Sequence, residues 1–157
     1  MYNLSSHYAG DYLLHQSPML LVDEIQQVSE NDIEVTIKLG EKQRLFVDKN
    51  QQIPVWISVE LMAQTIGTWA GIQGKIQHNT EAKIGFLLGA RQCKYFVTHY
   101  LMDEVLRVEA HLLMQDQRMA SFDVKIVNAQ NQVTAEGRLT TYQPDEQELT
   151  QLLKKKE

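Results

Sequence analysis

A regular alternation of polar and apolar residues predicts β-strands near the start of the chain. Residues 32–39 alternate without a break over eight positions, and the segment 19–28 before them opens apolar and becomes mixed. The residues between them, 29–31, are Ser-Glu-Asn, which favour a tight turn. We therefore expect these two segments to form a β-hairpin.

The second half of the chain predicts further strands. Short polar turns at 116–117 and 128–131 separate the later segments, and such brief connections allow only antiparallel pairing. The four extended segments expected here are 83–96, 104–115, 120–128 and 133–142.

Between the two groups of strands, residues 55–76 have the periodicity of a long α-helix. Its apolar arc is broader than a surface helix requires, so we expect the helix to be wrapped on most sides. This arc comprises Val59, Met62, Ala63, Ile66, Trp69, Ala70 and Gln73. The expected fold class is α+β, with one long central helix against a curved antiparallel sheet of about six strands.

A second line of residues follows the same helix at spacings of three and four. Glu60, Gln64, Gly67 and Gly71 form a narrow seam that changes from polar to small side chains, against which a thin substrate could lie. The alternative is that the two glycines only allow a strand or a partner helix to approach closely.

Glu60 is the candidate for chemistry, because it lies between Val59 and Leu61 at the start of a helix that is expected to be buried. An ionised carboxylate loses several kcal/mol on leaving water unless it finds a partner. A carboxylate in this place therefore either forms an ion pair or hydrogen bond with a partner, or takes part in a reaction. The second possibility indicates an enzyme.

The remaining segments bound the domain. Residues 12–14 suggest one or two helical turns, and residues 147–157 suggest a short amphipathic helix ending in lysines. Residues 40–53 are expected to form a polar loop, whose length suggests a function beyond linking its two neighbouring elements. We expect one domain over residues 1–157, with its core at about 10–146 and a C-terminal helical tail.

Composition narrows the function classes. The 157 residues are 43% hydrophobic and carry a net charge of −5, which argues against nucleic acid as a partner. Cys93 is the one cysteine, no apolar run reaches a membrane span, and no secretory segment follows Met1, so the cytoplasm is the expected location. The histidines and the cysteine lack metal-ligand spacing, so no metal is expected.

Several motifs together resemble the hotdog-fold 3-hydroxyacyl-[acyl-carrier-protein] dehydratases. Residues 13–23, LLHQSPMLLVD, resemble the opening signature of that family, and Pro54, Glu60, Ala63 and Gln64 match its central helix. Segments 85–89 and 91–95 resemble its third strand. Together with Trp56, residues 69–71 and the ending 142–145, the chain looks closest to the second dehydratase type of bacterial aryl polyene gene clusters, over about residues 10–146.

The resemblance implies a function. It implies dehydration of a 3-hydroxyacyl thioester on an acyl carrier protein to the trans-2-enoyl form, in fatty acid or aryl polyene type synthesis, by a homodimer or a heteromer with another hotdog protein. The acyl-phosphopantetheine substrate brings the reactive group, so no separate cofactor is expected. The alternatives are a hotdog acyl thioesterase and a non-catalytic hotdog subunit of a heteromeric dehydratase.

One position departs from the family. The standard dehydratases carry a catalytic histidine fourteen residues before the acid, where this chain has Phe46. His15 is the candidate for the second catalytic group, as the base beside the acid Glu60. The ordinary alternative is that His15 bonds a nearby backbone group and fixes the turn into Pro18. His99 is a weaker candidate, expected in a loop.

The resemblance also implies binding residues. Gln64 is expected to orient Glu60, and the helix N-terminus at Val55 and Trp56 to polarise the thioester carbonyl. Gly67 and Gly89 are expected to line the acyl site. Because carrier proteins of this class are acidic, Arg91 and Lys94, with Arg44, are the expected docking cations.

Overall fold

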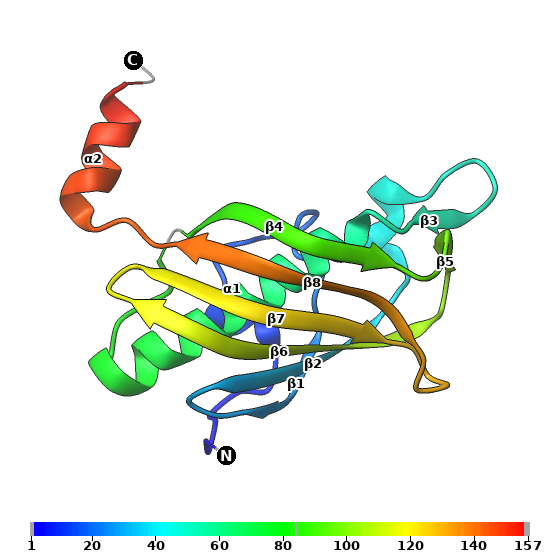
Figure 1. Ribbon diagram of the computed structural model, residues 1–157, viewed down its shortest axis with the longest axis horizontal. Helices are drawn as coiled ribbons and strands as arrows, with labels where there is room; N and C mark the ends of the chain where they lie inside the picture. The colour runs from blue at the N-terminus through cyan, green and yellow to red at the C-terminus, as the bar shows by residue number, and fades with distance from the viewer. Residues whose placement is uncertain (1, 84, 156–157) are drawn as a thin grey trace.

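The computed structural model describes residues 2–83 and 85–155, and in it a long helix lies against one antiparallel sheet (Figure 1). The sheet has six strands in the order β1-β2-β6-β7-β8-β4, which confirms the expected α+β architecture. The strands are β1 (Glu24–Val28), β2 (Asp32–Lys38), β4 (Phe86–Tyr95), β6 (Val105–Asp116), β7 (Met119–Val127) and β8 (Val133–Tyr142).

The alternating pattern decides which face of each strand is buried. In β2, Ile33, Val35 and Ile37 are buried while the residues between them are at least partly exposed. The register places Val35 opposite Val108 of β6, so apolar side chains of neighbouring strands meet on the face that packs on the helix. The expected hairpins β1–β2, β6–β7 and β7–β8 are all confirmed.

The central helix α1 (Ile57–His78) is enclosed from two sides. Leu61, Ile66 and Ile72 belong to the core shared with the sheet, and the short 3₁₀ helix η1 (Ala9–Tyr12) lies against another side. Within the predicted arc, Val59, Ala63 and Ala70 are only half-buried. The N-terminal segment of the same chain therefore provides part of the cover that the helix needs.

Gly71 marks the point where the N-terminal segment touches α1. A Cβ atom built on Gly71 would lie 2.2 Å from the backbone oxygen of Tyr12, a distance that no real side chain occupies. The close-approach interpretation is therefore confirmed for Gly71.

We expect Gly71→Ala to lower the free energy of unfolding by about 1–3 kcal/mol, because the added methyl must displace backbone. Gly89→Ala is the matched control, since nothing lies within 4 Å of a Cβ at that strand position. Urea unfolding of both variants checks this, and equal stabilities would contradict it.

Residues 40–53 differ from the expected polar loop. They contain a 3₁₀ helix η2 (Glu41–Phe46) and a strand β3 (Gln52–Pro54), which pairs with β5 (His99–Leu101) in a second small sheet. His99 thus lies in a strand, and the prediction of a loop there was wrong. Tyr100 beside it is buried, and desolvation raises the pKa of its hydroxyl, which lies 2.9 Å from Ser58 Oγ in the first turn of α1.

The C-terminal tail forms the helix α2 (Glu146–Lys154), which projects from the body of the molecule (Figure 1). Its N-cap Asp145 accepts a hydrogen bond from the Glu148 backbone N–H at 2.8 Å, and Arg118 forms ion pairs with both residues. Lys156 and Glu157, the end of the predicted tail, lie outside the described residues. No helix in the described part of the chain is long and apolar enough to cross a membrane.

Candidate active site

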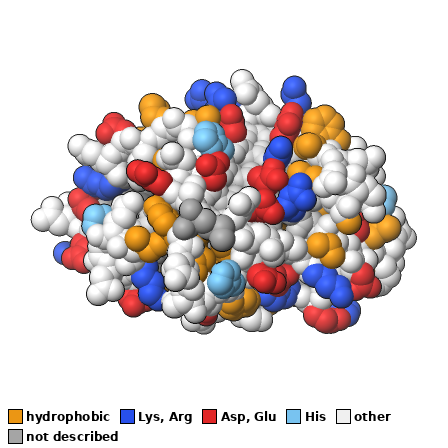
Figure 2. All heavy atoms as spheres, turned by 90° about the horizontal axis from the view of Figure 1, so that it is seen from below, with side chains coloured by type: hydrophobic (Ala, Val, Ile, Leu, Met, Phe, Trp, Pro, Cys, Tyr) orange, Lys and Arg blue, Asp and Glu red, His pale blue; other side chains and the backbone are white. Residues whose placement is uncertain are grey.

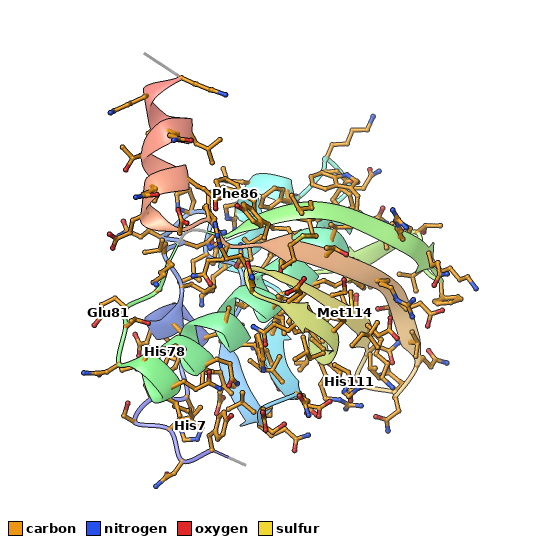
Figure 3. All side chains as sticks on the ribbon, turned by 60° about the vertical axis from the view of Figure 1, so that its left-hand side comes forward. His7, His78, Glu81, Phe86, His111 and Met114 are labelled. Carbon is orange, nitrogen blue, oxygen red and sulfur yellow. The ribbon has the colours of Figure 1, made fainter. Side chains whose placement is uncertain are left out.

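A groove of about 680 Å³ follows α1 and contains the candidate catalytic residues. His15 and Glu60 line it near the start of the helix, whereas His78 and Glu81 line it near the helix end. Figure 3 shows His78, Glu81 and Phe86 coming from the end of α1, the following segment and the start of β4. The groove therefore extends along most of the helix, with the candidate chemistry at one end.

His15 and Glu60 lie together in this groove. The His15 Nε2 atom is 3.7 Å from Glu60 Oε1, and both residues belong to the same chain. The Glu60 side chain is 40% exposed and that of His15 is 41% exposed, so the expected burial of Glu60 was wrong. The apolar residues beside Glu60 in sequence point to other sides of the helix, which leaves the carboxylate at the groove surface.

Gln64 holds the carboxylate of Glu60 from one turn further along the helix. Its Nε2 donates hydrogen bonds to Glu60 Oε1 and to the Met19 backbone oxygen, both at 2.8 Å. Its Oε1 accepts a hydrogen bond from the Leu21 backbone N–H at 2.9 Å. Gln64 thus orients Glu60 and ties α1 to the segment that follows His15.

The loop position where the standard dehydratases carry histidine has a packing role here. Phe46 contacts Trp56 edge to face, with ring centroids 5.8 Å apart. Trp56 is the N-cap residue of α1, and the Val55 oxygen accepts a hydrogen bond from Ser58 N–H at 3.0 Å. Neither Val55 nor Trp56 lines the groove, so they lie at the helix start without touching its walls.

The remaining predicted binding residues divide into two groups. Gly67 lines the groove beside Leu13, whose Cδ2 atom would be 2.9 Å from an added Cβ. Gly89, Arg91 and Lys94 lie on β4 and do not line the groove. The structure therefore brings Gly67 to the candidate site and leaves the three β4 residues outside it.

Lys94 lines a second, open hollow on the outer face of the sheet. Cross-strand ion pairs cover this face, including Arg138 with Asp123 at 2.9 Å and Lys125 with Glu109 at 3.2 Å. In the space-filling view of the molecule from below, basic and acidic side chains are also intermingled (Figure 2).

The groove that contains the dyad, the pair of His15 and Glu60, does not include His7, His111 or Cys93. His111 lies on β6 and contacts Asp32 at 2.7 Å, and His7 belongs to the N-terminal segment (Figure 3). Cys93 is a free thiol in β4. Among the residues that the structure describes, no cluster of three or more His, Cys, Asp or Glu side chains could hold a metal ion.

The sequence pattern does not indicate two features of the site: the main-chain atoms of Met19 and Leu21, to which Gln64 bonds, and the buried side chain of Gln43. No periodicity marks Gln43, because it lies in an irregular polar segment. The LLHQSPMLLVD motif does contain Met19 and Leu21, but a motif does not show which backbone atoms serve as partners.

Comparison with known proteins identifies relatives over nearly the whole chain. The family model described as ApeP-like, ApeP dehydratase, matches residues 8–154. The 3-hydroxyacyl-[acyl-carrier-protein] dehydratase FabZ of Acinetobacter baylyi is 27% identical over 133 residues, which cover 83% of this chain and 84% of that protein.

Solved structures agree with the family model. A chain of the dehydratase heterocomplex ApeI:P from Xenorhabdus doucetiae superposes with a TM-score of 0.87 at 32% identity, covering 93% of this chain and 97% of that one. A hypothetical thioesterase of Streptococcus pneumoniae, solved with coenzyme A, has a TM-score of 0.60 at 17% identity over 77% of this chain and 84% of its own. The thioesterase similarity extends only to the hotdog fold. The extent of the family match and the closer structural similarity to the heterocomplex show that this chain belongs to the ApeP-like dehydratase family.

Proposed function

We propose that this chain removes water from a 3-hydroxyacyl thioester on an acyl carrier protein, giving the trans-2-enoyl thioester in aryl polyene or related fatty acid synthesis. The observation that carries the proposal is the pairing of His15 with Glu60, 3.7 Å apart, at one end of a groove along α1. Dehydration needs a base for the proton next to the carbonyl and an acid for the departing hydroxyl. This pair provides one group for each role.

In the proposed mechanism, His15 Nε2 takes the proton from the carbon next to the thioester carbonyl. The C–O bond then breaks as Glu60 donates its proton to the hydroxyl, which leaves as water. Within the described residues Glu60 Oε2 makes no hydrogen bond, so it is the oxygen available to carry that proton. After the reaction the imidazole holds the extra proton, and its proximity to Glu60 allows the proton to return.

The thioester carbonyl requires polarisation as negative charge develops on its oxygen. The N-terminal end of α1, which follows Val55 and Trp56 just outside the groove walls, supplies the positive end of the helix dipole. Gly67 lines the groove in which the acyl chain is proposed to lie, with Leu13 filling the space beside it, and Gly89 lies outside that groove on β4. The phosphopantetheine arm carries the reactive thioester, so the proposed chemistry uses no further cofactor.

The decisive assay is incubation of the purified protein with a 3-hydroxyacyl thioester of an acyl carrier protein. Loss of water, measured by mass spectrometry of the carrier, supports dehydration. Release of free thiol indicates a thioesterase instead. If neither occurs with any chain length tested, although a partner dehydratase works on the same substrates, the chain is a non-catalytic subunit.

We infer that the working form is a dimer with another hotdog chain, either a second copy or a different protein; the similar structure named above is a dehydratase heterocomplex. One edge of β4 is unpaired among the described residues, and Phe86, Leu87 and Leu88 on this strand are exposed. An apolar sheet edge of this kind favours association. Sedimentation at micromolar concentration is expected to show a dimer alone or with the second chain, and a stable monomer in both cases would contradict it.

Arg91 and Lys94 remain the proposed docking cations for an acidic carrier protein. Neither forms a salt bridge within the described part of the chain, whereas Arg44 is paired with Glu41 through a 2.8 Å hydrogen bond. Because Arg44 is neutralised by its neighbour, the two β4 cations are better suited to attract an acidic surface.

Charge reversal at either β4 cation, Arg91→Glu or Lys94→Glu, is expected to weaken carrier binding roughly tenfold at low salt and less at high salt, because salt screens exposed charges. Lys38→Glu on β2, far from β4 in the strand order, changes the net charge equally and is the control. Surface plasmon resonance at two ionic strengths measures the effect. Equal affinities for all three variants would place docking elsewhere.

We propose that the protein acts in the cytoplasm. With Cys93 as its one cysteine, the chain has no internal disulfide, which is usual for proteins of that reducing compartment.

A further inference from the structure

Gln43 is a fully buried amide in η2, next to the candidate site but outside its groove. Its Oε1 accepts a hydrogen bond from the Gly40 backbone N–H at 2.7 Å, and its Nε2 donates one to the Leu21 backbone oxygen at 3.0 Å. A buried amide without partners costs several kcal/mol, so these two bonds fix the side chain in one orientation.

The same residue, Leu21, is held from the opposite side by the central helix. Its backbone N–H donates to Gln64 Oε1 at 2.9 Å, while its backbone oxygen accepts from Gln43. Gln64 is also buried, and its amide nitrogen donates to Glu60 Oε1 at 2.8 Å. Two buried glutamines therefore hold the two polar groups of one residue, and one of them contacts the candidate acid.

Leu21 also stands at the end of a turn that begins beside His15. Within this turn, the backbone N–H groups of Met19 and Leu20 donate to the Gln16 oxygen at 2.8 and 3.2 Å. These bonds make residues 16–21 a compact connection. Leu21 is therefore connected to His15 through the turn and to Glu60 through Gln64.

We propose that Gln43 is a positioning residue of the dehydratase site, which acts through Leu21 to set His15 and Glu60 against each other; this inference rests on the proposed function. The contact it sets is a loose one, since 3.7 Å is long for a hydrogen bond. A displacement of about 1 Å at such a site can cost about a hundredfold in rate. The helix η2 has Phe46 in place of the loop histidine of the standard dehydratases. In this proposal η2 contributes to catalysis through Gln43, whose side chain does not contact the substrate.

The test is Gln43→Met, which keeps a side chain of similar length and removes both hydrogen bonds. We expect kcat to fall roughly ten- to a hundredfold while KM stays within about twofold, because binding along the groove is unchanged. Thr140→Val is the matched control. Thr140 on β8 is half-buried and bonds Ser121 on β7 at 3.0 Å, and neither residue lines the groove, so this variant loses a side-chain hydrogen bond away from the site and should keep kcat per folded molecule.

A double variant separates positioning from a general loss of stability. If Gln43 acts through the dyad, adding Gln43→Met to Glu60→Gln should lower the residual kcat by less than about twofold, because residues acting as a unit are non-additive. Should Gln43→Met fail to fold, Gln43→Asn adds no buried charge and is one methylene too short to keep both hydrogen bonds, so it gives the same comparison. A kcat close to that of the wild type per folded molecule, or losses that multiply in the double variant, would overturn the proposal.

Failure of the proposed function has a different signature. In that case the wild-type protein itself forms no enoyl thioester, whatever the Gln43 variants do. If the wild type is active and the Gln43 variants keep kcat as Thr140→Val does, the dehydratase function stands and the positioning role alone is lost.

Discussion

Glu60→Gln should lower the turnover of 3-hydroxyacyl carrier protein by about 10²-fold or more, because the amide cannot donate the proton that the leaving hydroxyl needs. The substitution keeps the size of the side chain, and an amide oxygen can still accept the hydrogen bond that Gln64 donates at 2.8 Å. Since the side chain is 40% exposed, the folded state loses little. The measurement is steady-state dehydration together with thermal unfolding of the same preparation.

Glu30→Gln is the matched control for this variant. Glu30 is exposed in the turn between β1 and β2, so the same change of charge there should leave turnover within about twofold. A Glu60→Gln enzyme that keeps more than about a tenth of the wild-type rate would remove Glu60 from the role of acid.

His15→Ala should depress turnover on a similar scale with little loss of thermal stability. The imidazole is the base in the proposed mechanism, and its 3.7 Å separation from Glu60 Oε1 is short enough for both groups to reach one substrate. The double variant with Glu60→Gln should be hardly worse than either single variant, since the two residues act as a unit. The measurement is a double-mutant cycle, in which the turnover of the wild type, the two single variants and the double variant is compared.

A structural role for His15 gives a different pattern. His15→Ala would then lower stability first and leave near-normal rates in the molecules that remain folded. His7→Ala provides the comparison, because His7 is an exposed histidine of the same N-terminal segment (Figure 3). If His15→Ala resembles His7→Ala in rate, the base must be sought in bound water or in a neighbouring chain.

The alternation of polar and apolar residues was sufficient to predict the sheet and its hairpins. Burial in a strand follows a period of two, so residues 32–39 already determine that Ile33, Val35 and Ile37 face the core. The apolar helix was predicted within two residues at each end for the same reason. The spacing of four between Glu60 and Gln64 likewise implied their contact, because such residues lie on one face of a helix.

Local pattern could not predict contacts between distant segments. Nothing in residues 40–53 indicates that Gln52–Pro54 pairs with His99–Leu101, because strand pairing depends on where the rest of the chain places the two segments. The exposure of Glu60 was missed for a related reason. Its apolar sequence neighbours point to other faces of α1, and only the packing around the helix shows which face stays open.

The sequence by itself therefore determined most of the main helices and strands, the family and the candidate acid on the central helix. The tertiary structure decided which groups meet that acid. It places His15 3.7 Å from Glu60 and connects Gln43 to both residues through Leu21. It also lets Gln64 bond to the backbone of Met19 and Leu21, which are 45 and 43 residues away in the sequence. Such contacts form only when the N-terminal segment folds onto α1, and the position of Gly71 against Tyr12 shows how closely it does so.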